Sequence, residues 1–431
     1  MSTFKIVVLG IFGFFLLVAV LIFSGLVPGL NIGSKEPEAQ VVLWGTIPAG
    51  NISGLIEDFN RQYKPLVLIY IEKNKNTFDR ELVEALASGV GPDVIMLPQS
   101  LIYRHADKVY PISYETFPER DFRNTFVEEA ELYLTSQGTL ALPLTIDPMV
   151  MYFNRDILSK AGIALPPQTW EEVLSMTPRL VLKDAAGNIT QSAVAFGEFK
   201  NVIYAKDIIA LLTMQAGSPI VARTETGYRS VFGDSLGFSL KPADEAVRYF
   251  TDFSNPVQPI YSWNKGKPSS RDAFISGTLA FYFGYASELF GIQSNNPHLN
   301  FDVAPVPQVK GSRASITLGN ISGLSITKAS RNPTAAFRVA SLLSGQALSL
   351  SFAQKTYLPP PRRDILSGRP SNAYMSVFFT SALMSRGFID PSPDQTSAIF
   401  GDMVENVVSG RLRVGEAVMN ANSEFAGLFI R

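Results

Sequence analysis

The chain has 431 residues, of which 46% are hydrophobic and 17% charged, so it is long and apolar enough to form more than one core. Its formal net charge of −1 excludes a general nucleic-acid binder, and the lack of cysteine excludes disulfides, zinc–thiolate centres and thiol catalysis. Because His105 and His298 are the only histidines, a histidine-rich metal site is excluded too, and we expect no metal and no cofactor.

The first predicted element is a long apolar run. No side chain from Ile6 to Phe23 is polar, and a helix from Ile6 to Val27 would cross the ~30 Å hydrocarbon core of a bilayer. A cleaved secretory signal is the alternative, but the run exceeds the usual ~7–15 residues and no typical cleavage site follows it. We therefore expect residues 1–30 to form an uncleaved transmembrane helix in the plasma membrane, with the rest of the chain on the extracytoplasmic side.

Residues 31–40 are polar and predict a short tether. Strand-like and helix-like segments then alternate, with the periodicity that each type of element requires. Strands are expected at 41–47, 66–73 and 92–98, and amphipathic helices at 52–63 and 78–91. This order predicts a parallel α/β sheet.

A second set of elements follows Asp147. Thr169 and Glu172 form a capping-box pattern at the start of a helix. Further helices are expected at 207–217, 242–254, 269–277 and 333–344, and strands at 279–285, 301–308 and 323–330. Proline-rich pieces near Pro143, Pro305–Pro307 and Pro359–Pro361 predict connectors between two α/β lobes. Such lobes commonly bind a ligand between them and close by a hinge motion.

Several segments together resemble the extracellular solute-binding proteins of family 1, the maltose-binding-protein-like subunits of ABC importers. They occur in the family's order and cover nearly everything from Val41 onward: "VVLWG", "LASGVGPDVIML", "LPLTIDPMVMYFNRDILSKAGI", "PPQTWEEV", "SSRDAFISGTLAFYFGY", "HLNFDVAPVPQ" and "LPPPRRD". The resemblance implies a two-lobed periplasmic-binding-protein type II fold without catalysis. We expect residues 41–144 plus 306–357 to form one lobe, and 145–305 plus 358–431 the other.

The resemblance also implies a set of ligand-binding positions. They are the loop after the first strand, the loop after the "PDVIM" strand, an acidic position, and C-lobe positions where aromatic rings stack on sugars. In this sequence they fall on Trp44, Thr46, Gln99, Ser100, Asp147, Tyr285, Ser287 and Phe400. Ser322 completes the set at a position where the family often has an aromatic residue.

Departures from the family pattern bear on the ligand. Leu97 and Ser287 stand where maltose binders carry tryptophan, and Ser322 also replaces an aromatic ring. Fewer flat aromatic surfaces argue against a long oligosaccharide ligand. A membrane anchor in place of a lipidated cysteine is a further departure.

Single residues also have structural interpretations. Asp147 lies alone in an apolar strand-like run, where a carboxylate can accept hydrogen bonds from a ligand or act as a turn residue satisfied by nearby backbone. Trp44 and Tyr285 are candidates for ligand contact or for the core. Trp263 lies in a polar loop, where it can serve recognition or pack beneath the loop.

One catalytic pattern occurs, "GDSLG" at Gly233–Gly237. A nucleophile elbow needs a strand before the serine and a helix directly after it, and "FSLKP" follows instead. A serine hydrolase is therefore the least favoured alternative, and no catalytic residue is predicted.

The leading functional prediction is a monomeric, membrane-tethered receptor that binds a small polar solute, with a sugar as the favoured class, and delivers it to an ABC permease. A membrane-tethered sensor or scaffold with the same fold is the alternative, motivated by the missing aromatic residues. No nucleic-acid partner is expected.

Overall fold

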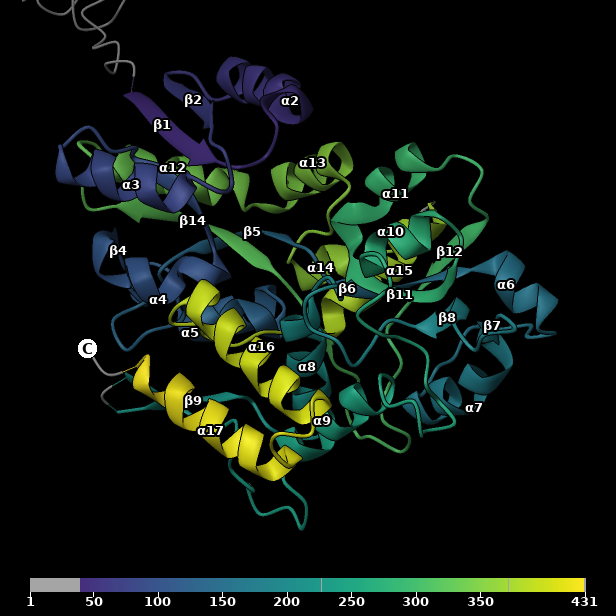
Figure 1. Cartoon of the computed structure of the whole chain (residues 1–431). Coiled ribbons are helices and arrows are strands. Elements are labelled where there is room, and N and C mark those ends of the chain that lie inside the picture. The colour runs from purple at the N-terminus through teal and green to yellow at the C-terminus, as the bar shows by residue number, and fades with distance from the viewer. Residues whose placement is uncertain (1–38, 226, 371, 430–431) are drawn as a thin grey trace, which may run out of the picture.

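The structure is a computed structural model that describes residues 39–429, apart from 226 and 371. Two sheets form the centres of two lobes (Figure 1). The predicted membrane span from Ile6 to Val27 lies outside the described residues. Among the residues that are described, no helix is long and apolar enough to cross a membrane.

Lobe I is built on a six-stranded sheet with the order β2-β1-β3-β14-β4, in which β5 also pairs with β14. Its strands are β1 (Ala39–Gly45), β2 (Leu66–Glu72), β3 (Val94–Pro98), β4 (Val109–Tyr110), β5 (Leu142–Ile146) and β14 (Ile321–Thr327). The predicted parallel pairing holds for β1 with β2 and β3. The sheet as a whole is mixed, because β14 returns from lobe II and runs antiparallel to β3 and β5.

Lobe II is built on a five-stranded sheet with the order β12-β6-β11-β8-β7. Its strands are β6 (Met149–Asn154), β7 (Leu182–Lys183), β8 (Ile189–Val194), β11 (Leu279–Tyr285) and β12 (Phe301–Ala304). Every residue of β11 is buried, as its unbroken apolar sequence predicts. Two small pairs complete the strands: β9 (Val221–Thr224) with β10 (Gly227–Ser230), and β13 (Thr317–Leu318) with β15 (Ser385–Arg386).

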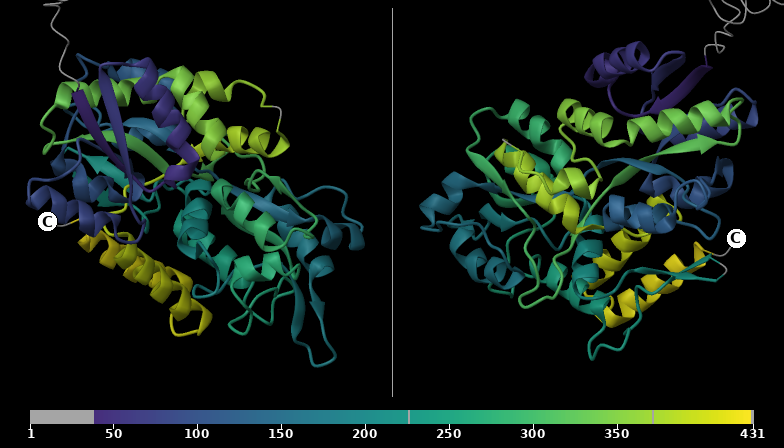
Figure 2. Two further views of the ribbon diagram at one scale, coloured as in Figure 1. Left: turned by 90° about the horizontal axis from the view of Figure 1, so that it is seen from above. Right: turned by 180° about the vertical axis from the view of Figure 1, so that it is seen from behind.

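Helices cover both sheets (Figures 1 and 2). The first part of the chain contributes the helices α2 (Ala49–Gln62), α3 (Phe78–Ala87), α4 (Ile102–His105) and α5 (Glu119–Thr125). Two more helices follow β14: α12 (Pro333–Leu343) and α13 (Gln346–Thr356). The central part contributes α6 (Arg155–Lys160), α7 (Trp170–Leu180), α8 (Ala205–Gln215), α9 (Pro242–Asp252), α10 (Ser270–Ile275) and α11 (Leu289–Asn295). The last are α14 (Arg363–Leu366), α15 (Ala373–Met384), α16 (Pro393–Val408) and α17 (Val414–Gly427), and short 3₁₀ helices occur at η1 (Gln99–Leu101), η2 (Ala106–Lys108), η3 (Glu128–Tyr133) and η4 (Ala286–Glu288).

Strand periodicity explains how β1 is buried on both sides. Val41 and Leu43 pack into one hydrophobic cluster together with Ile52 of α2. Trp44, one residue along, points to the opposite face and joins the larger cluster. The helix start predicted at Thr169 is confirmed, since its hydroxyl accepts the Glu172 N–H of α7 at 3.3 Å.

The chain crosses between the lobes in three places. The first crossing is at Asp147 and Pro148, between β5 and β6. The connector predicted near Pro143 is therefore misplaced by a few residues: Pro143 lies inside β5, opposite Gly323, where the register shifts and a missing N–H is tolerated. The other crossings follow β12 and α13, at the proline-rich pieces predicted for them. The lobe boundaries given above stay a prediction.

Candidate functional site

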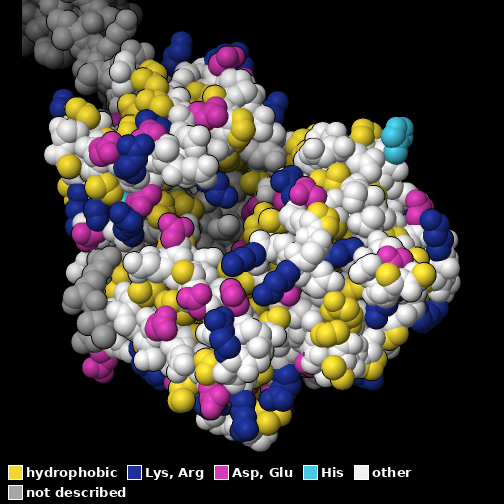
Figure 3. All heavy atoms as spheres, viewed as in Figure 1, with side chains coloured by type: hydrophobic (Ala, Val, Ile, Leu, Met, Phe, Trp, Pro, Cys, Tyr) yellow, Lys and Arg dark blue, Asp and Glu magenta, His cyan; other side chains and the backbone are white. Residues whose placement is uncertain are grey.

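The three crossings are hydrogen-bonded to one another. Asp147 and Asn320 exchange two backbone hydrogen bonds, at 3.2 and 3.0 Å, and the Ile146 N–H donates to the Pro359 carbonyl at 3.2 Å. On the face drawn in Figure 3 the surface is hollowed between the lobes, with basic and acidic side chains at the edges of the hollow. Side chains placed at the crossings therefore lie where both lobes can reach a bound molecule.

Asp147 stands at the first crossing and is half-buried. Its Oδ1 accepts the Ser287 N–H from η4 at 3.0 Å, so lobe II fixes the orientation of the carboxylate. Burial raises the pKa of Asp147 to about 6, against the opposing effect of the Ser287 hydrogen bonds. The carboxylate is thus ionised at neutral pH and remains a hydrogen-bond acceptor.

Tyr285 ends β11 and connects to α8. Its hydroxyl donates to Asp207 Oδ2 at 2.9 Å, and its ring meets the Tyr204 ring edge-on with centroids 4.9 Å apart. Tyr204 precedes α8 with φ of 63°, a left-handed conformation that is rare for a tyrosine and recurs at functional sites. Burial raises the pKa of Asp207.

Sequence reasoning missed Tyr204 and Asp207. The sequence shows Asp207 only as an acidic residue in the first turn of a largely apolar helix. Acidic residues are common there because they interact favourably with the helix dipole, so the position gives no sign of a binding role. Only the folded chain brings this acid to Tyr285, which lies far away in sequence.

Glu129 of η3 is a third acid near the crossings, and it too was missed. Its side chain is 1% exposed, and its carboxyl oxygens have no well-aligned hydrogen-bond partner among the described residues, although a weak contact with the Ile321 backbone lowers its pKa. Burial raises its pKa to about 8, with a further contribution from the charge of Asp147, while Arg386 acts in the opposite direction. Glu129 is therefore mostly protonated at neutral pH.

The cations near these acids come from both lobes. In lobe II, Lys206 pairs with Asp390 at 2.8 Å, and Arg271 Nε lies 3.3 Å from Glu288 Oε1. Arg386 spans the lobes to Glu128 at 2.5 Å. Lys75, in the exposed loop after β2, lowers the pKa of both Asp147 and Asp207 against the larger effect of burial.

The predicted residues at the strand ends differ in how accessible they are. Thr46 in lobe I and Ser287 in lobe II are exposed, and Ser100 and Ser322 in lobe I are half-buried, so all four have accessible surface. Gln99 braces the second crossing instead, since its Nε2 donates to the Gly319 carbonyl at 2.9 Å.

Trp44 is 8% exposed and is covered by Lys73, whose Nζ lies 3.8 Å from the ring centroid. Lys73 in turn pairs with Glu81 at 3.0 Å. The indole is therefore held in a cation–π contact within its own lobe, and little of its face is accessible in this conformation.

Trp263 and Phe400 are core residues in this conformation. Neither has accessible surface: the Trp263 indole N–H donates to Asn201 Oδ1 at 3.0 Å, and the Phe400 ring packs 4.9 Å from that of Phe232. This matches the packing interpretation of the Trp263 loop. A part in ligand contact stays a prediction for both residues.

Neither the serine motif nor a metal site is supported by the structure. Ser235 of "GDSLG" lies in an irregular exposed segment between β10 and α9, without the strand and helix that an elbow requires. Among the described residues, no group of histidines and carboxylates could hold a metal ion.

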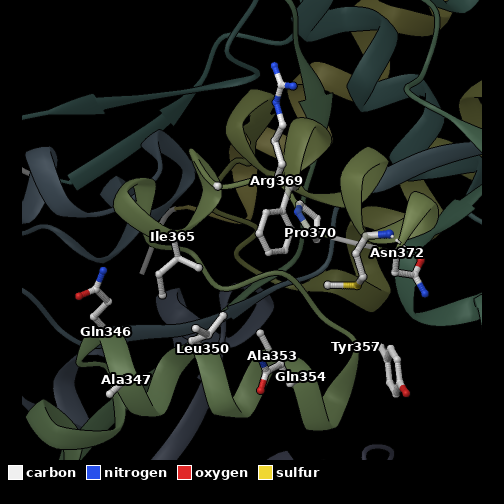
Figure 4. A pocket seen from close by; sticks show the side chains of 13 residues that line it. Gln346, Ala347, Leu350, Ala353, Gln354, Tyr357, Ile365, Arg369, Pro370 and Asn372 are labelled. Atoms are coloured by element: carbon white, nitrogen blue, oxygen red, sulfur yellow. Dashed lines mark hydrogen bonds between the residues drawn. The ribbon is translucent and has the colours of Figure 1, made fainter.

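A pocket of about 690 Å³ lies between α13 and the α14–α15 segment, apart from the acids at the crossings (Figure 4). Leu350 of α13 and Ile365 of α14 point toward each other in it, while the Arg369 side chain extends away from α13. No acidic residue lines this pocket. Apolar side chains share its lining with polar ones such as Gln346 and Asn372, and none of the predicted ligand-binding residues lines it.

Comparisons with known proteins agree with this architecture. The chain is 22% identical to a probable ABC transporter-binding protein of Deinococcus radiodurans over 67% of this chain and 68% of that protein. The fold matches the sugar-binding protein MalE from Xanthomonas citri with a TM-score of 0.73, at 18% identity, over 91% of this chain and 97% of the other. A cyclo/maltodextrin-binding protein complexed with maltotetraose gives a TM-score of 0.72, at 15% identity and the same coverage of both chains.

A family model covers more than half of the sequence. It describes the bacterial extracellular solute-binding proteins and matches residues 52–347, a range that includes strands of both sheets and the first two crossings. The chain therefore belongs to the family of bacterial extracellular solute-binding proteins.

Proposed function

We propose that the protein captures a small polar solute, a carbohydrate, between its lobes and delivers it to an ABC permease. Family membership makes it a binding protein rather than an enzyme. The observation that carries the proposal is the convergence of Asp147, Tyr285 and Ser287 at the crossing of the two lobes. Ionised carboxylates and tyrosine hydroxyls beside exposed serine and threonine side chains suit the hydroxyl groups of sugars.

The proposed contacts come from both lobes. In lobe I they are Thr46, Ser100, Ser322 and Trp44, although Trp44 is only 8% exposed. At the crossing and in lobe II they are Asp147, Tyr285 and Ser287. Gln99 acts in this proposal through the crossing that it braces. A sugar is further supported by the folds of the maltotetraose complex and of the Xanthomonas sugar-binding protein.

Titration calorimetry of the full chain in mild detergent tests the proposal. Glucose, maltose and maltotetraose are titrated into the native protein and into Asp147→Ala. We expect at least one sugar to bind, and Asp147→Ala to weaken it tenfold or more, because the variant loses a charge-assisted acceptor worth about 1.5–3 kcal/mol. A folded protein that binds none of the sugars would contradict the proposal.

A sensor or scaffold is the second candidate. The observation that favours it is the absence of aromatic side chains at Leu97, Ser287 and Ser322, which leaves little stacking surface for a transported oligosaccharide. Solute uptake by membrane vesicles that contain the full chain and its permease separates the two functions. Solute-dependent uptake supports transport, whereas binding without uptake supports sensing.

We also propose that the chain acts as a monomer held at the outer face of the plasma membrane by Ile6 to Val27. The support is the unbroken apolar sequence, together with the extracytoplasmic location of the family. A lobe arrangement able to close around the solute would then face its permease on the same surface.

A further inference from the structure

The acids at the crossing come from three separate elements. Asp147 lies at the first crossing, Asp207 in the first turn of α8, and Glu129 in η3. Asp207 accepts a hydrogen bond from the Tyr285 hydroxyl at 2.9 Å, and Asp147 accepts the N–H of Ser287, two residues after Tyr285. Burial, and then the charges of Asp207, Asp147 and Glu129, raise the pKa of the Tyr285 phenol. Independent parts of both lobes thus place carboxyl groups around one point.

The positively charged side chains of lobe II, and Arg386, already form ion pairs with other acidic side chains. Lys206 lies 2.8 Å from Asp390, Arg271 3.3 Å from Glu288, and Arg386 2.5 Å from Glu128. The cations that act on Asp207 are Lys206, whose charge is shared with Asp390, and Lys75. The cation that acts on Asp147 is Lys75, on an exposed loop for which no ion pair is found in the part of the chain that the structure describes. The described charges at the crossing therefore leave an excess of acids over cations.

Glu129 responds to this excess by keeping its proton. Its carboxyl is buried, with only a weak contact to the Ile321 backbone, and burial together with the charge of Asp147 holds it mostly neutral at pH 7. A poorly satisfied buried polar group costs free energy, so such groups are rare unless a ligand or function requires them.

Resting on the function proposed above, we infer that the solute is an amino sugar, whose protonated amine lies against Asp147 and Asp207. A neutral sugar would donate hydrogen bonds to these carboxylates but leave their charges uncompensated once the lobes exclude water. An ammonium group supplies charge-assisted hydrogen bonds and the missing positive charge together. The half-buried Tyr204 ring beside Tyr285 adds an aromatic surface of the kind that attracts cations.

Matched sugar pairs test the inference by calorimetry on the full chain in mild detergent. D-glucosamine is compared with D-glucose, and the β-1,4-linked glucosamine disaccharide with cellobiose, since each pair differs only in amine against hydroxyl. We expect the amine member to bind at least tenfold more tightly at pH 7.5 and low salt. The preference should shrink in 0.5 M NaCl, because surface-accessible charge interactions are screened.

Two variants separate charge from shape. Asp207→Asn keeps the size of the side chain and should reduce the amine preference to less than threefold, because the affinity for the amine member falls more than that for its neutral partner. Asp121→Asn, on the exposed start of α5, is the matched control and should keep the full preference.

The outcomes distinguish this inference from the function on which it rests. Equal or tighter binding of the neutral members would overturn the amino sugar and leave solute binding intact. An amine preference unchanged in Asp207→Asn would also overturn it. Binding of neither member of either pair by folded protein counts against both.

Discussion

At the scale of single residues, the buried Glu129 has a consequence for stability. Its pKa, raised to about 8 by burial, exceeds that of a glutamate in the unfolded chain, so the folded state holds one more proton between about pH 4.5 and 8. The extra proton bound by the folded state therefore increases the free energy of unfolding at low pH, and this contribution is lost as the pH rises toward 8. The charge of Arg386 lowers the pKa of Glu129 and that of Asp147 raises it, and the value of about 8 already includes both effects.

We predict that Glu129→Gln removes this pH dependence. In the native chain the free energy of unfolding should fall by about 2 kcal/mol between pH 6 and 7.5, at roughly 1.4 kcal/mol per pH unit. The amide has nearly the same shape and does not titrate, so the variant should show a much smaller fall. Urea unfolding at both pH values measures it.

Glu115→Gln, at an exposed position, is the control and should behave as the native chain does. The prediction fails if the native chain is equally stable at both pH values, or if Glu129→Gln keeps the native slope. Either result would mean that the Glu129 carboxyl is solvated or paired in solution.

Some residues of the site could be predicted from the sequence and others could not. Asp147 was predicted because a lone acid in an apolar crossing requires an explanation, and it does lie at the crossing. Trp263 and Phe400 were predicted from local sequence and family position, but burial depends on what packs over a ring, and both lie in the core here. Asp207 and Glu129 were missed because their partners lie on elements distant in sequence.

At the scale of elements, the helices and strands with clear periodicity were predicted well. The strand at 279–285 and the helix start at Thr169 match β11 and α7. The antiparallel insertion of β14 was not predicted, since pairing between strands so far apart in sequence leaves no local pattern. The proline-containing piece near Pro143 predicts a connector, yet Pro143 lies within β5, where a register shift accommodates it.

The second crossing offers a test of how tightly these elements are packed. Gly319 lies between β13 and β14, and a Cβ atom added there would lie 1.8 Å from Glu129 Oε2. Because the Glu129 side chain is buried, we predict that Gly319→Ala destabilises the chain by about 1–3 kcal/mol, the usual cost of overpacking. Urea unfolding of the full chain measures the loss.

The double variant identifies the cause. Removing the Glu129 carboxyl with Glu129→Ala should make room for the new methyl group, so Gly319→Ala should cost little in that background. Gly427→Ala, at the end of α17 where no atom lies within 4 Å of an added Cβ, is the control. If Gly319→Ala lowers the free energy of unfolding equally in the native and Glu129→Ala backgrounds, the two side chains do not contact each other in solution.

At the scale of the whole molecule, the proposed delivery of solute to a permease requires that the two-lobed chain and the permease meet. A receptor confined to the membrane surface meets its partner at a high effective concentration without lipidation. The sequence has no cysteine to which a lipid could be attached, and its longest apolar run is at residues 6–23. Tethering through that run is therefore the simplest route to confinement.

We predict that Ile6 to Val27 is retained in the mature protein as its anchor. Protein extracted from native membranes should begin at or near Met1 and partition into detergent, and cleavage after Lys35 should release a soluble chain that still binds solute. The predicted tether at 31–40 overlaps β1, which begins at Ala39, but cleavage after Lys35 falls before that strand, so both hydrophobic clusters should stay intact. N-terminal sequencing and detergent partitioning before and after cleavage provide the measurements. A mature N-terminus downstream of Ser24 would show that the segment is a cleaved signal, and the receptor would then diffuse freely or be held by another protein.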